Sequence, residues 1–173
     1  MTPAERYAAL RSLPQALAET AGRLGDVTAL SAKRDGAWKT WSYAAFHDQA
    51  WRFAARLRAA GVAPGDRVLL ASENRPEWAI ADAAIMAAGA ITVPAYATNT
   101  AEDHRHVLND SGAKAAIIST PALAARFLPA YAAAAGCSIL FAMEPVDGAE
   151  TLDDAIAAGG DADVDATVAG LKR

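Results

Sequence analysis

Short apolar runs alternate with segments of helical periodicity along most of this chain of 173 residues. The runs lack polar alternation, which is typical of strands that are buried on both faces of a sheet. Such strands, joined by helices, predict an α/β fold with a mainly parallel, doubly wound sheet, right-handed crossovers and flanking helices. The four expected strands are residues 67–71, 90–93, 114–118 and 138–141.

The segment after Ser42 carries the clearest helix signals. Ser42 is a suitable N-cap, and Trp41 and Phe46 hold the two positions of a hydrophobic staple. Apolar residues then recur every three or four positions until Gly61, which can adopt the left-handed conformation that ends a helix. By similar signals, further helices are expected at residues 76–88, 101–109, 121–135 and 151–158.

This pattern divides the chain into three regions. Residues 1–41 form an N-terminal segment with a short amphipathic stretch and a small β-hairpin, whose strands 27–32 and 38–41 meet at a turn. Residues 42–160 form the α/β subdomain. Residues 161–173, which are acidic and rich in alanine, are expected to be a linker or an unfinished element.

Composition excludes several classes of protein. The formal net charge is −4, and the 16 basic residues are not clustered in one stretch. A positively charged surface that binds nucleic acid is therefore not expected. Cys137 is the only cysteine, which rules out an internal disulfide. The most apolar stretch, residues 79–97, contains Asp82 and Pro94 and indicates a buried helix and strand instead of a transmembrane segment. With no apolar signal core at its start, the protein is expected to be cytoplasmic.

No phosphate-binding loop is recognisable. Neither G-x-G-x-x-G nor G-x-x-x-x-G-K with a following Ser or Thr occurs. In the loop after the first expected strand, Glu73 would repel a phosphate and Pro76 lacks an amide donor, so a plain turn is favoured. Ser72 in the same loop has no G-x-S-x-G context and is not expected to act as a nucleophile.

The three histidines do not suggest a metal site. His104 and His106 are two residues apart on one expected helix and therefore point to different faces. Both are expected to be exposed. His47 lies beside the apolar stripe of its helix, where a boundary residue with satisfied hydrogen bonds is expected.

The C-terminal aspartates do not form a calcium loop, because two other residues that such a loop requires are missing. Asp161, Asp163 and Asp165 have the spacing with which such a loop begins. Ala166 stands where the sixth position needs glycine, and Lys172 stands at the twelfth instead of Glu. A solvated segment is the favoured interpretation.

Two further residues favour structural roles. Asp82, inside an apolar helix, is expected to bond to a backbone amide or an arginine at the core boundary. Cys137 precedes a strand and is expected to be buried and unreactive. We therefore expect no catalytic, cofactor-binding or metal-binding residue in this chain.

An ordered set of short motifs covers much of the chain, with Trp78 following Glu77 and Tyr96 shortly after Pro94. The motifs are residues 41–43, 61–68, 73–78, 88–90, 93–96, 98–100 and 108–114. In this order they resemble the N-terminal region of AMP-forming acyl-CoA synthetases of the adenylate-forming superfamily, and in particular the long-chain fatty acid–CoA ligase branch. Their glycines and prolines serve turns and helix ends, so the resemblance concerns the fold.

The resemblance implies an ATP-dependent enzyme that converts a fatty acid and CoA to acyl-CoA, AMP and pyrophosphate through an acyl-adenylate, with Mg²⁺. Members of the family hold ATP with a Ser/Thr/Gly-rich loop and a Lys. They also use an aromatic-Thr-Glu segment, a ribose-binding Asp and a catalytic Lys in a C-terminal domain. None of these maps onto this sequence, and the chain would end just before the phosphate loop.

Three functions remain open at this point. In the first, the chain is an inactive scaffold within such a ligase, and the remaining subdomains of the enzyme are its partners. The parent enzyme could then form a homodimer and make peripheral contact with a membrane. Alternatively, it is a stand-alone interaction or dimerisation module derived from this fold. A small nucleotide-binding protein is the least favoured reading, because no phosphate loop exists.

Overall fold

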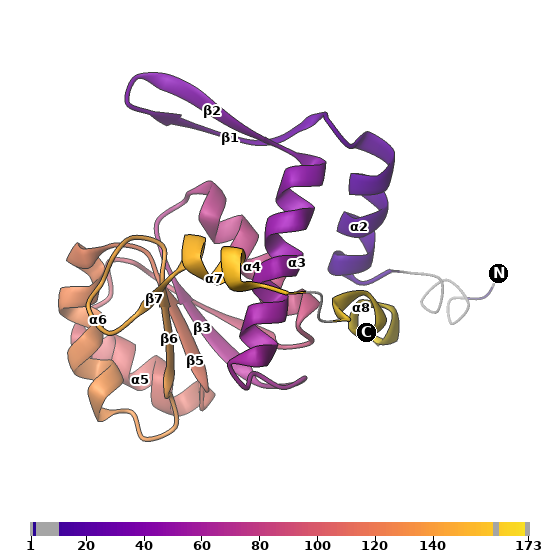
Figure 1. The fold of residues 1–173 in the computed structure, drawn as a ribbon. Coiled ribbons are helices and arrows are strands. Elements are labelled where there is room, and N and C mark those ends of the chain that lie inside the picture. The colour runs from indigo at the N-terminus through magenta and orange to yellow at the C-terminus, as the bar shows by residue number, and fades with distance from the viewer. Residues whose placement is uncertain (1, 3–10, 161–162, 172–173) are drawn as a thin grey trace.

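The computed structural model describes residue 2, residues 11–160 and residues 163–171. A five-stranded parallel sheet forms its centre, helices cover both faces, and a two-stranded antiparallel hairpin projects from the body (Figure 1). This is the α/β architecture that the alternating pattern predicts: helices connect β3 to β4, β4 to β5 and β5 to β6, and a loop without a helix connects β6 to β7.

The sheet has the strand order β4-β3-β5-β6-β7, and all four neighbouring pairs are parallel. The chain therefore adds one strand on one side of β3 and then continues on the other side. Four strands match the expected ones closely, and the fifth, β7, was not expected because it is very short and has no apolar run. The strands are β3 (Arg67–Ala71), β4 (Ile91–Ala95), β5 (Ala115–Ile118), β6 (Ile139–Ala142) and β7 (Glu150–Thr151).

Strand β4 runs through Pro94, where the sequence suggested that it would stop. The amide of Ile91 donates to the carbonyl oxygen of Asp66, on the side of β3. Amide directions alternate along a strand, so the nitrogen of Pro94 faces outward, where no ladder hydrogen bond is needed. Because β4 is an edge strand, proline fits there and leaves that edge poor in donors for further strand pairing.

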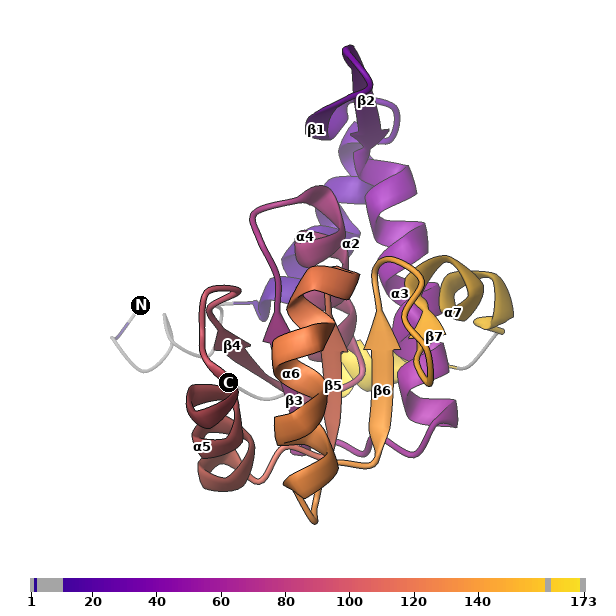
Figure 2. The ribbon, with the colours of Figure 1, turned by 90° about the vertical axis from the view of Figure 1, so that its left-hand side faces the viewer.

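The two faces of the sheet form two separate apolar clusters. One face packs α3, α4, α7 and α8, and the other packs α5 and α6 (Figure 2). Helix α2 lies on α3 and α4. The helices are α2 (Leu13–Leu24), α3 (Tyr43–Ala59), α4 (Pro76–Ala87), α5 (Ala101–Ser111), α6 (Pro121–Ala133), α7 (Leu152–Ala158) and α8 (Val164–Gly170). Within the described residues, no helix is both long and apolar enough to cross a bilayer.

The expected hairpin is present and longer than its apolar pattern indicated. It consists of β1 (Thr28–Arg34) and β2 (Ala37–Ser42). The turn between them places Asp35 at φ 50° and Gly36 at φ 82°. Positive φ at both central turn residues matches the right-handed twist of paired strands, which is why an Asp-Gly pair serves here.

Residues 164–170 form a short helix within the segment 161–173, which was expected to be a linker or an unfinished element. Asp163 caps α8, and Val164 and Val168 are buried against the core. The side-chain amide of Gln15 donates to the carbonyl oxygen of Val168 at 3.1 Å. The acidic composition obscured the four-residue spacing of the two valines, which is the helical signal.

Candidate functional site at the carboxyl edge of the sheet

The switch in strand order places a hollow at the carboxyl ends of β3 and β5, where ligands bind in many open α/β sheets. Residues 72–75 follow β3, residues 119–120 follow β5, and the hairpin turn approaches from the side. The hollow has a volume of about 550 Å³. Its lining includes Lys33, Arg34, Glu73, Arg75, Thr120 and Glu144.

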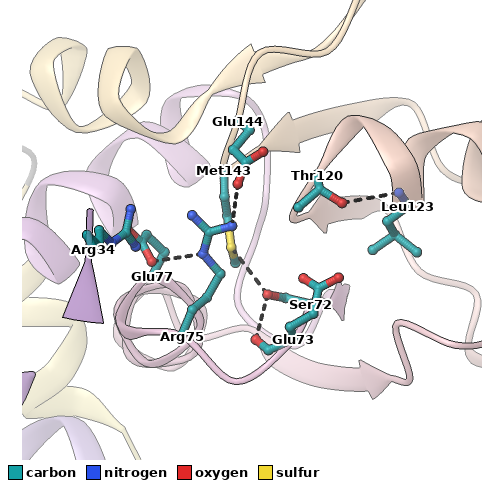
Figure 3. A network of polar contacts seen from close by, with 9 residues as sticks. All are labelled: Arg34, Ser72, Glu73, Arg75, Glu77, Thr120, Leu123, Met143 and Glu144. Atoms are coloured by element: carbon teal, nitrogen blue, oxygen red, sulfur yellow. Dashed lines mark hydrogen bonds and ion pairs between the residues drawn. The ribbon is translucent and has the colours of Figure 1, made fainter. Parts of the chain in front are cut away.

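A ladder of ion pairs crosses this edge (Figure 3). Arg34 at the end of β1 donates from Nη2 to Oε1 of Glu77 at 2.5 Å. Arg75 donates from Nε to Oε2 of Glu77 at 2.9 Å and from Nη1 to Oε1 of Glu144 at 2.8 Å. The ladder therefore joins the hairpin, the start of α4 and the end of β6.

The centre of this ladder is largely removed from solvent. The side chains of Glu77 and Arg75 are 16% and 15% exposed. Burial alone would raise the pKa of Glu77, but the hydrogen bond from Arg75 and the charges of Arg75 and Arg34 outweigh it, so the pKa lies below its ordinary value. These groups are paired with one another, which gives the ladder a structural role.

Replacing Glu77 with glutamine should lower the free energy of unfolding by about 2 kcal/mol, because two guanidinium groups lose their shared carboxylate. Since folding lowers the pKa of Glu77, its contribution is present at neutral pH and is lost as pH falls below 4.5, the ordinary value. Urea denaturation at pH 7 and pH 4 measures both effects. Glu102→Gln, at an exposed pair with Arg105, is the control and should change stability by less than about 0.5 kcal/mol. Equal effects of the two variants would contradict the role of the ladder.

The hydroxyl of Ser72, in the loop after β3, has two contacts. The hydroxyl of Ser72 donates to the backbone carbonyl of Glu73 at 2.8 Å and lies 3.5 Å from the sulfur of Met143. The pKa of Glu73 is lowered, chiefly by the nearby hydroxyl of Ser119. The hydroxyl of Ser119 is buried and has no hydrogen-bond partner of ordinary geometry among the described residues. Its contact with Glu73 is therefore weaker than a regular hydrogen bond.

The hollow does not fit the phosphates of ATP. Helix α4 starts with Pro76, and the carboxylate of Glu77 lies in its first turn. At the start of α6, the hydroxyl of Thr120 already accepts the amide of Leu123 at 3.2 Å. In the part of the chain that the structure describes, no three His, Cys, Asp or Glu side chains are grouped as a metal site would need. No step of ATP chemistry is therefore assigned to these residues.

Helix α5 places its two histidines on different faces, as their spacing predicts, but His104 is fully buried instead of exposed. Its ring packs edge-on against Phe127 at 5.2 Å between centroids, in the contact between α5 and α6. His106 is exposed. The spacing of the two residues shows that they diverge, but not which of them faces α6.

His47 lies at the core boundary, as expected, with its ring 3.9 Å from that of Trp51 between centroids. Its Nε2 is buried without a hydrogen-bond partner among the described residues, so the expectation of satisfied hydrogen bonds is wrong for that atom. Asp163 caps α8, and Asp165 accepts a hydrogen bond from the indole of Trp51 at 2.8 Å. Asp161, together with Lys172, lies outside the described residues.

The remaining candidates have structural environments. Asp82 accepts a hydrogen bond from the hydroxyl of Thr92 at 2.7 Å, so its partner is a side chain on β4 and not the expected amide or arginine. Cys137 is 6% exposed, and burial raises the pKa of its thiol to about 11, which keeps it protonated and unreactive, as expected.

Sequence reasoning missed the ion-pair ladder. Its pairs join residues that are 43 and 69 positions apart. A local signal existed for one contact alone, Arg75 beside Glu77 at the start of a helix. The other contacts depend on how the hairpin and β6 meet α4.

Comparison with known proteins identifies relatives of much of the chain. The family model described as AMP-binding enzyme matches residues 17–167. The long-chain-fatty-acid–CoA ligase FadD15 of Mycobacterium tuberculosis is 48% identical over 79 residues, which cover 46% of this chain and 13% of that protein. The long-chain-fatty-acid–CoA ligase ACSBG2 of Gallus gallus is 27% identical over 116 residues, covering 67% of this chain and 15% of that protein.

Among solved structures, a benzoate CoA ligase from Burkholderia xenovorans LB400 matches with a TM-score of 0.77 and 28% identity. The match covers 89% of this chain and 30% of that chain. The present chain therefore spans less than a third of each of these three proteins.

Proposed function

Because the chain belongs to the AMP-binding enzyme family, we propose that it forms the N-terminal α/β part of an ATP-dependent long-chain fatty acid–CoA ligase. The observation that carries the proposal is the 48% identity with the mycobacterial long-chain ligase over 79 residues. The whole enzyme would convert a fatty acid, ATP and CoA to acyl-CoA, AMP and pyrophosphate through an acyl-adenylate. ATP, Mg²⁺ and CoA belong to that whole enzyme, which we place in the cytoplasm.

Within such an enzyme the present residues serve as a scaffold. Their polar groups at the carboxyl edge are paired with one another in the ladder through Glu77 and Arg75. Pairing of this kind fixes the relative position of the hairpin, α4 and β6, which is the work of a scaffold. We therefore propose no catalytic, cofactor-binding or metal-binding role for residues of this chain.

Pyrophosphate release in the presence of ATP, Mg²⁺, CoA and a carboxylic acid tests both parts of the proposal. The protein encoded by the complete reading frame should turn over palmitate faster than benzoate. The 173-residue chain alone should release no pyrophosphate. Faster turnover of benzoate would contradict the long-chain assignment, and turnover by the chain alone would contradict the scaffold role. A full reading frame that stops after Arg173 and yields an inactive dimer would favour an interaction module instead.

A further inference from the structure

Helix α5 is attached to the rest of the molecule by few buried side chains. It lies beside the edge strand β4 and packs chiefly against α6 (Figure 2). Two of its side chains, His104 and Leu108, are buried. A helix that is held by so few buried contacts belongs to the part of a fold that opens locally at low free-energy cost.

One of these two buried side chains is an imidazole without hydrogen bonds. His104 is fully buried, and neither Nδ1 nor Nε2 has a hydrogen-bond partner among the described residues. Its ring lies edge-on to Phe127 of α6, with 5.2 Å between the centroids. Burying an imidazolium without an acceptor costs far more free energy than burying the neutral ring. The contact between α5 and α6 therefore requires the neutral form of His104.

The charged groups around His104 do not offset this cost. Burial lowers the pKa of His104, the charge of Arg126 on α6 lowers it further, and Asp103 on α5 opposes them in part. The carboxylate of Asp103 is already hydrogen-bonded to the amide and the hydroxyl of Thr100 at the helix cap. Apart from Arg126, the one titratable residue of α6 is Tyr131, which stays neutral because burial raises its pKa, and β4 has none. A protonated His104 thus faces a like charge on the helix against which it packs.

The two ends of α5 are held in different ways. At the C-terminal end, Gly112 has φ 59° and ψ 40°, and Arg67 of β3 donates to the carbonyl oxygens of Ser111 at 2.8 Å and Gly112 at 2.9 Å. Before the N-terminal end, Arg126 donates to the carbonyl oxygen of Ala97 at 2.8 Å through an exposed hydrogen bond. The buried imidazole lies in the half of the helix that is nearer to this exposed contact. The C-terminal end is therefore the natural pivot of the helix.

We propose that protonation of His104 releases α5 from α6 while the remaining sheet and its other helices stay folded. The charged ring leaves a site that offers it no acceptor and becomes hydrated. Helix α5 then turns about Gly112 and Arg67, and Leu108 and Phe127 become accessible to water. The fold thus contains a pH-sensitive element on one face of the sheet. The inference goes beyond the proposed function and does not depend on it, because it concerns the chain without substrates.

The direction and the size of the effect follow from proton linkage. In the released state His104 is exposed and binds a proton with the ordinary pKa of 6.5, whereas its pKa in the packed state is lower. Protons therefore favour the released state as pH falls below 6.5. Proton binding multiplies the population of that state by about 11 at pH 5.5 and by about 1.1 at pH 7.5. The ratio of released to packed α5 should thus rise about tenfold between these two pH values.

Amide hydrogen exchange of the 173-residue chain, corrected for the intrinsic effect of pH on exchange, tests this inference. The amides of residues 105–111 should lose protection about tenfold between pH 7.5 and pH 5.5, whereas those of α4 should keep theirs. His104→Leu should abolish the loss, because leucine does not titrate. His106→Leu changes an exposed histidine of the same helix and should leave the loss as it is in the wild type.

Unchanged protection of residues 105–111 over this range would overturn the inference. An equal loss of protection in α4 would also overturn it, because the whole chain would then be unfolding. The same loss in His104→Leu would assign the effect to another group. If that variant does not fold, an NMR titration of the wild-type ring decides: half-protonation of His104 at pH 6.5 while α5 stays protected would contradict the inference, and proton uptake that coincides with loss of protection would support it.

Discussion

Replacing Gly159 with alanine should lower the free energy of unfolding by about 3 kcal/mol, because the added methyl group has no space. A Cβ at this position would lie 2.2 Å from the carbonyl oxygen of Arg52 and 2.6 Å from its carbonyl carbon. Those atoms belong to the interior of α3 and cannot move without breaking helical hydrogen bonds. Urea denaturation measures the loss, which should come with detachment of α7 and α8 from α3.

The neighbouring glycine offers a matched control. A Cβ on Gly160 would have nothing within 4 Å, so Gly160→Ala should change the free energy of unfolding by less than about 1 kcal/mol. The backbone of Gly159 has φ −61° and ψ 111°, which other residues also adopt, so steric overlap and not backbone strain sets its effect. Equal losses in the two variants would show that α3 and the end of α7 are not packed this closely.

Replacing His104 with leucine should raise the free energy of unfolding by about 1–3 kcal/mol at pH 7, contrary to most core substitutions. His104 is fully buried, and neither ring nitrogen has a hydrogen-bond partner among the described residues. Its surroundings are the apolar contact between α5 and α6, with the ring of Phe127 edge-on. Leucine of similar volume would remove the unpaired polar atoms and keep the packing.

The same substitution should remove a pH dependence. Burial lowers the pKa of His104, the charge of Arg126 lowers it further, and Asp103 opposes them in part. The unfolded chain therefore binds a proton more readily than the folded chain, so the wild type loses stability as pH falls below 6.5. Urea denaturation between pH 7.5 and pH 5 should show a growing advantage of His104→Leu. A constant difference between the two proteins over this range would contradict the burial of a neutral imidazole.

His106 provides the control for this pair of measurements. It lies on the same helix and is exposed, so His106→Leu should change stability by less than about 0.5 kcal/mol at each pH. A gain in stability from His106→Leu equal to that from His104→Leu would point to helix propensity, instead of burial, as the cause.

Elements with local signals were predicted well. Ser42 accepts a hydrogen bond from the amide three residues later, as its position indicated, and Thr100, Thr120 and Thr151 do the same at the starts of their helices. The strand Arg67–Ala71 has the expected bounds. Such signals lie within a few neighbouring residues, because capping hydrogen bonds and apolar runs depend on local geometry and composition.

Features that depend on distant contacts were missed or misjudged. The burial of His104 depends on which side of α5 meets α6. The sequence of a short polar helix does not reveal which of its faces will be buried. Helix α8 is held by valines against the core and by Gln15 from the other end of the chain. The passage of β4 through Pro94 is allowed by its place at the edge of the sheet, which strand order alone establishes.

The amino-acid order was sufficient for the alternating α/β class, the hairpin, most helix ends and the family resemblance, because periodicity, caps and turn residues act over short distances. Strand order, the ladder through Glu77 and the burial of His104 came from the folded arrangement. These features arise from contacts between segments far apart in the chain, whose free energies are realised after the elements have packed.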